Sequence, residues 1–490
     1  MERLPQKVRS GLLALGCLAV LFVFFSPPFA AWRAWARAPE IGFLPETRRG
    51  VAVLEQAKAL GAPVVDPLHS AIQWRLLFPA VARGLGLPAW ALFGFAHVGA
   101  LLALWFLIEH AKARGATWGE AAFVALLAGA GAWFFAATGW LGYYDSWVVL
   151  GLLAVAFAAR REWGWLACLA VPWIDERFVL AVPLALLCRQ LDGDDGRRGN
   201  WKSECGMPLA LCAAFAVVRL AVLPGSVANA TVSGYLAWLD FSKTPWTQFV
   251  WGVWEGWRGG WVLIAVAVWA VAQRRGTTIA LTLGAASAAV LLVGLLTAQD
   301  FGRSMMLLAP LVGLGAGAWG GVTWPGKRRA LVGLAGAALV LPAHQVMSDA
   351  AMPVMTLNHE LGARREPPPR LSPAAYELSG VVEMERGNPQ KAEIALTIAI
   401  KLDERPTSAC KHRGLLYASA QRWSEARQDF RTWAENDERD PDAWLLVAQA
   451  EAALGNTAEA RVELQRALGL ASKEWAARPD VARFRARLGM

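Results

Sequence analysis

The chain has 490 residues, of which 56% are hydrophobic and only 18% are charged. This composition excludes an ordinary soluble enzyme, in which about a quarter of the residues are charged, and it favours a membrane protein. The formal net charge of +9 would suggest nucleic-acid binding in a soluble protein. Here most Lys and Arg residues lie in short loops between apolar runs, where they set membrane topology, so we expect no nucleic-acid partner.

Long apolar runs fill residues 10–345, and the sequence after them is rich in Glu, Arg, Asp and Ala. A helix needs about 20 apolar residues to cross the bilayer core, or fewer where it is re-entrant. The first run follows basic residues as a signal peptide would, but because further spans follow it we expect an uncleaved helix. We predict about eleven membrane segments, at residues 10–27, 88–109, 119–138, 144–159, 163–174, 177–190, 206–224, 259–273, 277–298, 304–322 and 329–345.

The loops between these segments differ in charge. Every second loop is basic, from Lys112 and Arg114 to the run Lys327–Arg329. The bias of Lys and Arg toward cytoplasmic loops places these loops and the N-terminus in the cytoplasm. An odd number of spans then puts the C-terminal domain on the outer side, in a periplasm or lumen.

The outer loops contain two further patterns. The first long loop, residues 30–87, includes an amphipathic stretch from Glu46 to Leu60, and the second, residues 226–260, contains five tryptophans. Such a density of Trp is typical of a helix in the lipid headgroup layer, with carbohydrate stacking as the alternative. A shorter outer turn, Asp175–Arg177, separates two short apolar segments and predicts a pair of half-depth or tilted helices with charges at the tip.

The last part of the chain is a repeat. We predict a linker rich in Pro and Arg at residues 346–370 and a repeat domain at residues 371–490. Three sets of positions recur every 34 residues: Gly380, Gly414 and Ala448; Ala392, Ala426 and Ala460; and Leu396, Phe430 and Leu464.

A period of 34, with small residues where helices approach and a large residue in the seam, is typical of tetratricopeptide (TPR) repeats. The predicted fold class is therefore all-α: a polytopic bundle of about eleven transmembrane helices, followed by an α-solenoid of three TPR repeats and a final capping helix. Such repeats bind a polypeptide partner on their concave face.

Ionisable residues near a bilayer are costly, so their placement is informative. In the predicted topology the outer loops gather most of them, within the motifs D-P-L-H, Y-Y-D-S-W, W-I-D-E-R-F and Q-D-F-G-R-S. Carboxylates can deprotonate a hydroxyl or hold a divalent metal ion, and guanidinium groups bind phosphate at two points. The candidate site residues are Glu40, Glu46, Asp66, His69, Arg75, Asp145, Asp175, Glu176, Arg177, Asp300 and Arg303.

Each of these residues also has a structural interpretation. The charges of Asp175–Arg177 and of Asp300 with Arg303 could form local ion pairs that cap helix ends. Asp66, which precedes Pro67, could be a helix N-cap. His69 has no second histidine near it and would then be a packing or capping residue.

The long first outer loop, the R-L-L-F-P entry into the second span at Arg75, and the charged outer tips resemble the C-type membrane glycosyltransferases over residues 1–345. With C-terminal repeats, the architecture is similar to the TPR-containing protein O-mannosyltransferases. The resemblance implies that a sugar moves from a polyprenyl-phosphate donor to an acceptor on the outer face, where the repeats bind the acceptor or a partner protein.

The resemblance also implies roles for individual residues. Asp66 would be the general base, and Arg177 and Arg303 would neutralise the departing lipid phosphate. The remaining outer residues would bind substrate, with Asp145, Asp175 and Glu176 orienting the acceptor or a metal ion. One departure stands out, because family members usually place an acid soon after the first span and residues 28–39 contain none. Glu40 or Glu46 would have to take that position.

Other functions stay open at this point. A ligase or polymerase of lipid-linked glycans would share the topology, but its large outer loop should come late in the bundle. A non-catalytic, membrane-anchored TPR scaffold for envelope or glycan-export machinery would leave the outer acids dispensable. A transporter would place polar residues at mid-bilayer in broken helices, whereas the charges here lie at the ends of the predicted spans.

Overall fold

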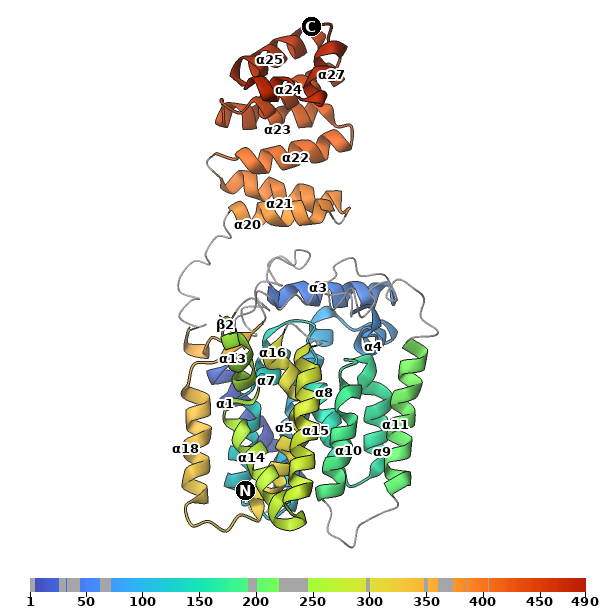
Figure 1. Ribbon diagram of the computed structural model, residues 1–490, viewed down its shortest axis with the longest axis vertical. Coiled ribbons are helices and arrows are strands. Elements are labelled where there is room, and N and C mark those ends of the chain that lie inside the picture. The colour runs from blue at the N-terminus through green and yellow to red at the C-terminus, as the bar shows by residue number, and fades with distance from the viewer. Residues whose placement is uncertain are drawn as a thin grey trace. The chain divides into compact units, whose positions relative to one another are not determined.

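In a computed structural model the chain is mostly helical and divides into two compact units, Met1–Arg365 and Glu366–Met490 (Figure 1). The second unit begins within the predicted linker, close to the predicted start of the repeats. The structure describes residues 5–25, 32, 45–61, 72–192, 201–219, 246–296, 300–347, 351–359, 373–385, 387–403 and 405–490.

The first unit is a bundle of helices with one small hairpin. Its two strands are β1 (His344–Val346) and β2 (Ala351–Pro353). Its helices are α1 (Gln6–Phe24), α3 (Pro45–Lys58), α4 (Leu77–Leu85), α5 (Ala89–Ala113), α6 (Trp118–Gly129), α7 (Ala132–Gly139), α8 (Asp145–Phe157), α9 (Arg161–Ala170), η2 (Val171–Trp173), α10 (Phe178–Asp192), α11 (Trp201–Val217), α13 (Trp246–Trp257), η6 (Arg258–Gly260), α14 (Trp261–Arg275), α15 (Thr277–Leu296), α16 (Phe301–Ser304), η7 (Met305–Leu308), α17 (Ala309–Gly320) and α18 (Lys327–Val340).

Every predicted apolar segment contains one of these helices, but fewer than eleven are long enough to cross a bilayer. Among the described residues four helices qualify by length and composition: α1, α5, α15 and the continuous run Phe301–Gly320. Helices α6 and α7, bent by 71° at their junction, make a fifth candidate. The remaining segments form helices of 10 to 17 residues, and α9 passes into the 3₁₀ helix η2 at a turn that contains Pro172.

Burial separates the centre of this bundle from its periphery. The run Phe301–Gly320 is buried along almost its whole length, whereas few residues of α15 are buried, and its Leu281 and Leu292 are 74% and 56% exposed. Glycine allows the central helices to approach closely, since a Cβ at Gly315 would lie 1.9 Å from the carbonyl oxygen of Leu263. An apolar surface of this kind suits contact with lipid.

Helix α3, the amphipathic stretch of the first long loop, lies across one end of the bundle (Figure 1). It packs closely there, because a Cβ at Gly50 would lie only 2.7 Å from Cβ of Leu141. The chain turns beneath it at Gly142, whose φ of +81° favours glycine. This contact brings the neighbouring Arg49 to the carbonyl oxygen of Gly142, to which its Nε donates at 3.0 Å.

Strands β1 and β2 occupy residues that the sequence assigned in part to the linker. They pair antiparallel with Gln345 opposite Met352, and Met347 bridges to Asp300. Arg258 supports this region from a left-handed backbone conformation with φ +47°. Its guanidinium is 1% exposed, pairs with Glu255 at 2.9 Å and donates to three carbonyl groups at the C-terminal end of α18, those of Ala338, Leu341 and Pro342.

The second unit consists of helical hairpins that stack in chain order (Figure 1). Three pairs pack as hairpins, α20 with α21, α22 with α23 and α24 with α25. The helices are α20 (Pro373–Glu385), α21 (Pro389–Leu402), α22 (Thr407–Ser419), α23 (Trp423–Asn436), α24 (Pro441–Ala453), α25 (Thr457–Leu470), α26 (Lys473–Ala476) and α27 (Pro479–Arg487).

The positions that recur every 34 residues meet inside these hairpins. A Cβ at Gly380 would lie 2.4 Å from the side chain of Leu396, and one at Gly414 would lie 2.5 Å from the ring of Phe430. In the third hairpin Ala448 and Leu464 are buried in the same cluster. Small residues are therefore needed at the first position because a large one fills the seam from the facing helix.

This packing predicts the effect of adding one carbon atom. Gly414→Ala should lower the free energy of unfolding of the second unit by about 1–3 kcal/mol, since the ring of Phe430 must move. The matched control is Gly469→Ala in α25, where a Cβ meets nothing within 4 Å and where alanine is the better helix former. Thermal unfolding of the full chain measures both. Equal shifts for the two variants would contradict this account of the seam.

Candidate active site

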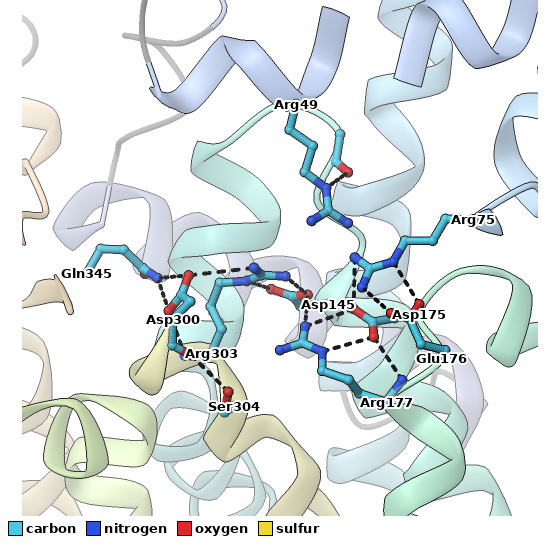
Figure 2. Close-up of polar contacts among 11 residues, drawn as sticks. Arg49, Arg75, Asp145, Asp175, Glu176, Arg177, Asp300, Arg303, Ser304 and Gln345 are labelled. Carbon is cyan, nitrogen blue, oxygen red and sulfur yellow. Dashed lines mark hydrogen bonds and ion pairs between the residues drawn. The ribbon is translucent and has the colours of Figure 1, made fainter. Parts of the chain in front are cut away.

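Seven of the candidate residues lie together at the end of the bundle that α3 covers: Arg75, Asp145, Asp175, Glu176, Arg177, Asp300 and Arg303 (Figure 2). They come from four separate segments, each at or just before the start of a helix. Six of the seven are buried, with exposed fractions from 1% for Asp145 to 9% for Arg75. We call this group, with Arg49 and Gln345, the charged cluster.

Two bidentate ion pairs form the centre of the charged cluster. Nε and Nη2 of Arg303 donate to the two carboxylate oxygens of Asp145 at 2.5 and 2.6 Å. Nε and Nη2 of Arg177 donate to those of Asp175 at 3.0 and 2.8 Å. A longer contact of 3.9 Å, from Arg177 to Asp145, links the pairs. Such geometry is the arrangement in which buried charges repay their desolvation.

Arg75 extends this network from the segment before α4. It donates to both oxygens of Glu176, at 3.0 and 3.2 Å, and lies 3.2 Å from a carboxylate oxygen of Asp175. Burial alone would raise the pKa of Asp175, but Arg177 and Arg75 outweigh it and hold that pKa well below its usual range. Asp175 is therefore ionised under all physiological conditions and is a poor proton acceptor.

Asp300 differs from the other carboxylates because its closest side-chain partner is neutral. Nε2 of Gln345 lies 2.6 Å from each of its oxygens, whereas the nearest guanidinium nitrogen, Nη1 of Arg303, is 3.6 Å away. Burial raises the pKa of Asp300, and Arg303 offsets this only in part. Asp300 is thus the carboxylate of the charged cluster best suited to accept a proton.

Arg49 enters the charged cluster from α3, and Figure 2 shows its guanidinium above the ion pairs. The guanidinium carbon lies 4.2 Å from the ring centre of Tyr143, and that of Arg303 lies 4.3 Å from the same ring. Within the part of the chain that the structure describes, no carboxylate pairs with Arg49. Burial, and after it the neighbouring Arg75, lower its pKa to about 10.

The described part of the charged cluster holds four guanidinium groups, those of Arg49, Arg75, Arg177 and Arg303, and four carboxylates, those of Asp145, Asp175, Glu176 and Asp300. The formal charges therefore sum to zero, but their distribution is uneven. Three guanidinium groups are each tied to a carboxylate by two hydrogen bonds. The fourth, that of Arg49, donates to the carbonyl oxygen of Gly142 and has no carboxylate partner among the described side chains.

Three other candidates, Glu40, Asp66 and His69, lie outside the described residues, and Glu46 belongs to α3. Sequence reasoning missed Arg49, Gln345 and Tyr143. A signal existed for two of them, because Arg49 lies in the amphipathic stretch and Tyr143 is two residues before Asp145 in Y-Y-D-S-W. Nothing in the sequence marks Gln345, which reaches the charged cluster only through the pairing of β1.

No group of three or more His, Cys, Asp or Glu side chains suited to a metal ion occurs among the described residues. No protein-family model matches the chain, and neither does any curated protein or solved structure.

Proposed function

We propose that the first unit is a membrane glycosyltransferase that moves a sugar from a polyprenyl-phosphate donor to an acceptor hydroxyl. The observation that carries this proposal is Arg49, a buried guanidinium with no carboxylate partner among the described side chains, held over a balanced set of ion pairs. A phosphate group on Arg49 would gain charge-assisted hydrogen bonds. The apolar helices below supply a path along which a prenyl chain can remain in the bilayer.

A second observation supports recognition of a hydroxyl group. Oε1 of Gln345 is buried and has no hydrogen-bond partner among the described residues, although Nε2 of the same amide holds Asp300. A buried acceptor without a donor is costly, and a hydroxyl group of a sugar or acceptor would satisfy it. The neighbouring Asp300 is then close enough to receive the proton of that hydroxyl.

The proposed transfer forms one bond and breaks another. The acceptor oxygen bonds to the anomeric carbon and loses its proton to a carboxylate, while the bond between that carbon and the phosphate oxygen breaks. Polyprenyl phosphate leaves with the bonding electrons. Arg49 stabilises the charge that develops on it. Arg177 and Arg303, to which the resemblance gives this role, are occupied by Asp175 and Asp145 and would support the charged cluster instead.

We also propose the finer architecture on which this function depends. The shorter helices complete a bundle of about eleven spans, some of partial depth, and the basic loops place the N-terminus in the cytoplasm. The three hairpins of the second unit are TPR repeats, which is supported by the contacts of Gly380 and Gly414 at the 34-residue positions. On the outer side they bind the acceptor polypeptide or a partner protein.

The test is sugar transfer by membranes that carry the chain, with a panel of polyprenyl-phosphate sugars and a cell-envelope extract. The variants Asp66→Asn and Asp300→Asn are compared with the unaltered chain at equal amounts of protein. Removing a general base typically costs a factor of about 10²–10⁴, so the variant that loses transfer identifies the base. If both variants keep full transfer, neither aspartate is the base and Glu40 or Glu46 becomes the candidate.

The rival proposal is a membrane-anchored scaffold in which the ion pairs only hold helices together. It is favoured by the engagement of Arg75, Arg177 and Arg303 with carboxylates. It predicts no transfer from any donor and no loss of function when Asp300 becomes Asn. Transfer by the unaltered chain would overturn it.

If Asp300 is the base, transfer depends on pH in a direction that follows from its raised pKa. The base must be ionised, so transfer should fall on acidification through a pKa above the value of about 3.9 for a free Asp. A pKa raised by folding means that protonation of Asp300 favours the folded state, so this group does not cause acid unfolding. Transfer rates and circular dichroism across the same pH range separate loss of activity from loss of fold.

A further inference from the structure

A second polar site lies where the start of α1 meets the end of α5 and the start of α6, at the end of the bundle opposite α3 (Figure 1). Helices α1 and α5 are both long and apolar enough to span a membrane. Tyr144, beside the charged cluster, donates to Leu92 near the start of α5, and Glu109 follows about 25 Å further along that helix. We call the second site the α1–α5 site. It consists of Arg9, Glu109, Lys112 and Trp118, all partly exposed.

Two cations of the α1–α5 site approach the same aromatic ring. Nζ of Lys112 lies 4.7 Å from the ring centre of Trp118 and donates to the carbonyl oxygen of Ala116 at 2.6 Å. The guanidinium carbon of Arg9 lies 5.8 Å from that ring centre, and Nε of Arg9 is buried without a hydrogen-bond partner among the described residues. An aromatic ring attracts cations but does not neutralise them. Both groups therefore keep a charge that can attract a phosphate.

Glu109 adds one negative group beside these cations. Its Oε2 accepts a hydrogen bond from Nε2 of Gln6 at 3.2 Å. Its Oε1 is buried and has no hydrogen-bond partner within the part of the chain that the structure describes. A buried acceptor without a donor is costly. A ligand that carries an N–H donor as well as a phosphate would satisfy Glu109 and the two cations together.

An apolar stripe begins beside the α1–α5 site. Val8, Leu12 and Leu15 are exposed, and their spacing of i, i+4 and i+7 puts them on one face of α1. The stripe extends from the polar site toward the middle of this candidate span. A ligand with a charged headgroup and a hydrocarbon chain matches both surfaces, whereas a soluble phosphate compound would leave the stripe uncovered.

We propose that the α1–α5 site binds the headgroup of phosphatidylethanolamine, with an acyl chain along the apolar stripe of α1. The phosphate would lie against Arg9 and Lys112, and the primary ammonium group would donate to Oε1 of Glu109. Phosphatidylcholine has a quaternary ammonium group without an N–H, and phosphatidylglycerol has no ammonium group, so neither satisfies Glu109. The proposal does not depend on glycosyltransferase activity.

The experiment uses the purified full chain in neutral detergent micelles that contain phosphatidylethanolamine, phosphatidylglycerol and phosphatidylcholine in equal amounts, and native mass spectrometry identifies the lipids retained. Arg9→Gln removes a partner of the phosphate and should weaken phosphatidylethanolamine retention by about tenfold or more. Glu109→Gln removes the partner of the ammonium group and should shift the preference to phosphatidylglycerol. A misfolded chain would lose both lipids, so this shift cannot arise from misfolding. The control, Arg328→Gln/Arg329→Gln, removes two exposed charges from α18.

The expected result is one phosphatidylethanolamine on the unaltered chain and on the control, its loss from Arg9→Gln, and its replacement by phosphatidylglycerol in Glu109→Gln. Equal retention of the three lipids by the unaltered chain, or an unchanged preference in both variants, would overturn the site. Glycerophosphoethanolamine, which has the headgroup without acyl chains, tests the source of the ligand and should not displace the lipid. If it binds alone at millimolar concentration and displaces the lipid, the ligand is soluble and the lipid assignment is wrong.

Discussion

Arg49→Gln is expected to reduce sugar transfer by a factor of about 10²–10³ while the fold survives. Removing a group that stabilises charge in the transition state typically costs this much. The loss should be larger in the rate constant than in the apparent donor affinity, because the phosphate carries more charge as it leaves. The measurement is the initial rate of transfer against donor concentration in membranes matched for protein.

The stability of the same variant distinguishes a functional from a structural role. No described carboxylate depends on Arg49, and glutamine can still donate to the carbonyl oxygen of Gly142. The free energy of unfolding should therefore change by less than about 2 kcal/mol. Loss of transfer together with collapse of the fold would show that Arg49 is a structural residue and would remove the main support for a phosphate site.

Arg303→Gln is expected to destabilise the fold, which Arg49→Gln should leave largely intact. Its free energy of unfolding should fall by about 3–5 kcal/mol. Asp145, 1% exposed, would remain buried without the partner that now holds both of its oxygens. An unpaired buried carboxylate must either stay charged at high cost or take up a proton. Thermal unfolding of the detergent-solubilised chain, followed by circular dichroism, measures the loss.

Three further variants make this prediction specific. Asp145→Asn/Arg303→Gln removes both charges, so its loss of stability should be smaller than the sum of the losses measured for Arg303→Gln and for Asp145→Asn alone. Arg422→Gln in the second unit breaks the ion pairs of an exposed arginine with Glu393 and Glu425 and should destabilise the chain far less than Arg303→Gln, because exposed pairs contribute little. Additive effects in the double variant would mean that the Arg303–Asp145 pair is not formed.

Hydropathy located the helices well because an apolar segment inside a bilayer has to be helical in order to satisfy its backbone. It did not settle how many of these helices are long enough to cross a bilayer. Helix α8 is apolar but only 13 residues long, and α6 turns sharply into α7 near Gly131, where a Cβ would lie 2.4 Å from the carbonyl oxygen of Gly256. Such breaks depend on contacts with distant helices, which hydropathy does not report.

The sequence also identified most of the charged residues of the charged cluster. Asp145, Asp175 and Arg303 interrupt or flank apolar sequence, so their cost in a bilayer made them visible. Which of them pair with one another was not predictable, since Arg303 and Asp145 are 158 residues apart and the local pairing of Asp300 with Arg303 looked equally good. Gln345 is uncharged and reaches Asp300 only because β1 folds back against β2.

The central claim is that the charged cluster holds the phosphate of a polyprenyl lipid on Arg49. Its most direct test is equilibrium binding of a short-chain polyprenyl phosphate to the purified full chain, compared with the Arg49→Gln variant and with Arg422→Gln as a matched surface control. We predict saturable binding to the unaltered chain and the control, weakened at least tenfold in Arg49→Gln. Equal binding by all three proteins, or no saturable binding to any, would contradict the account.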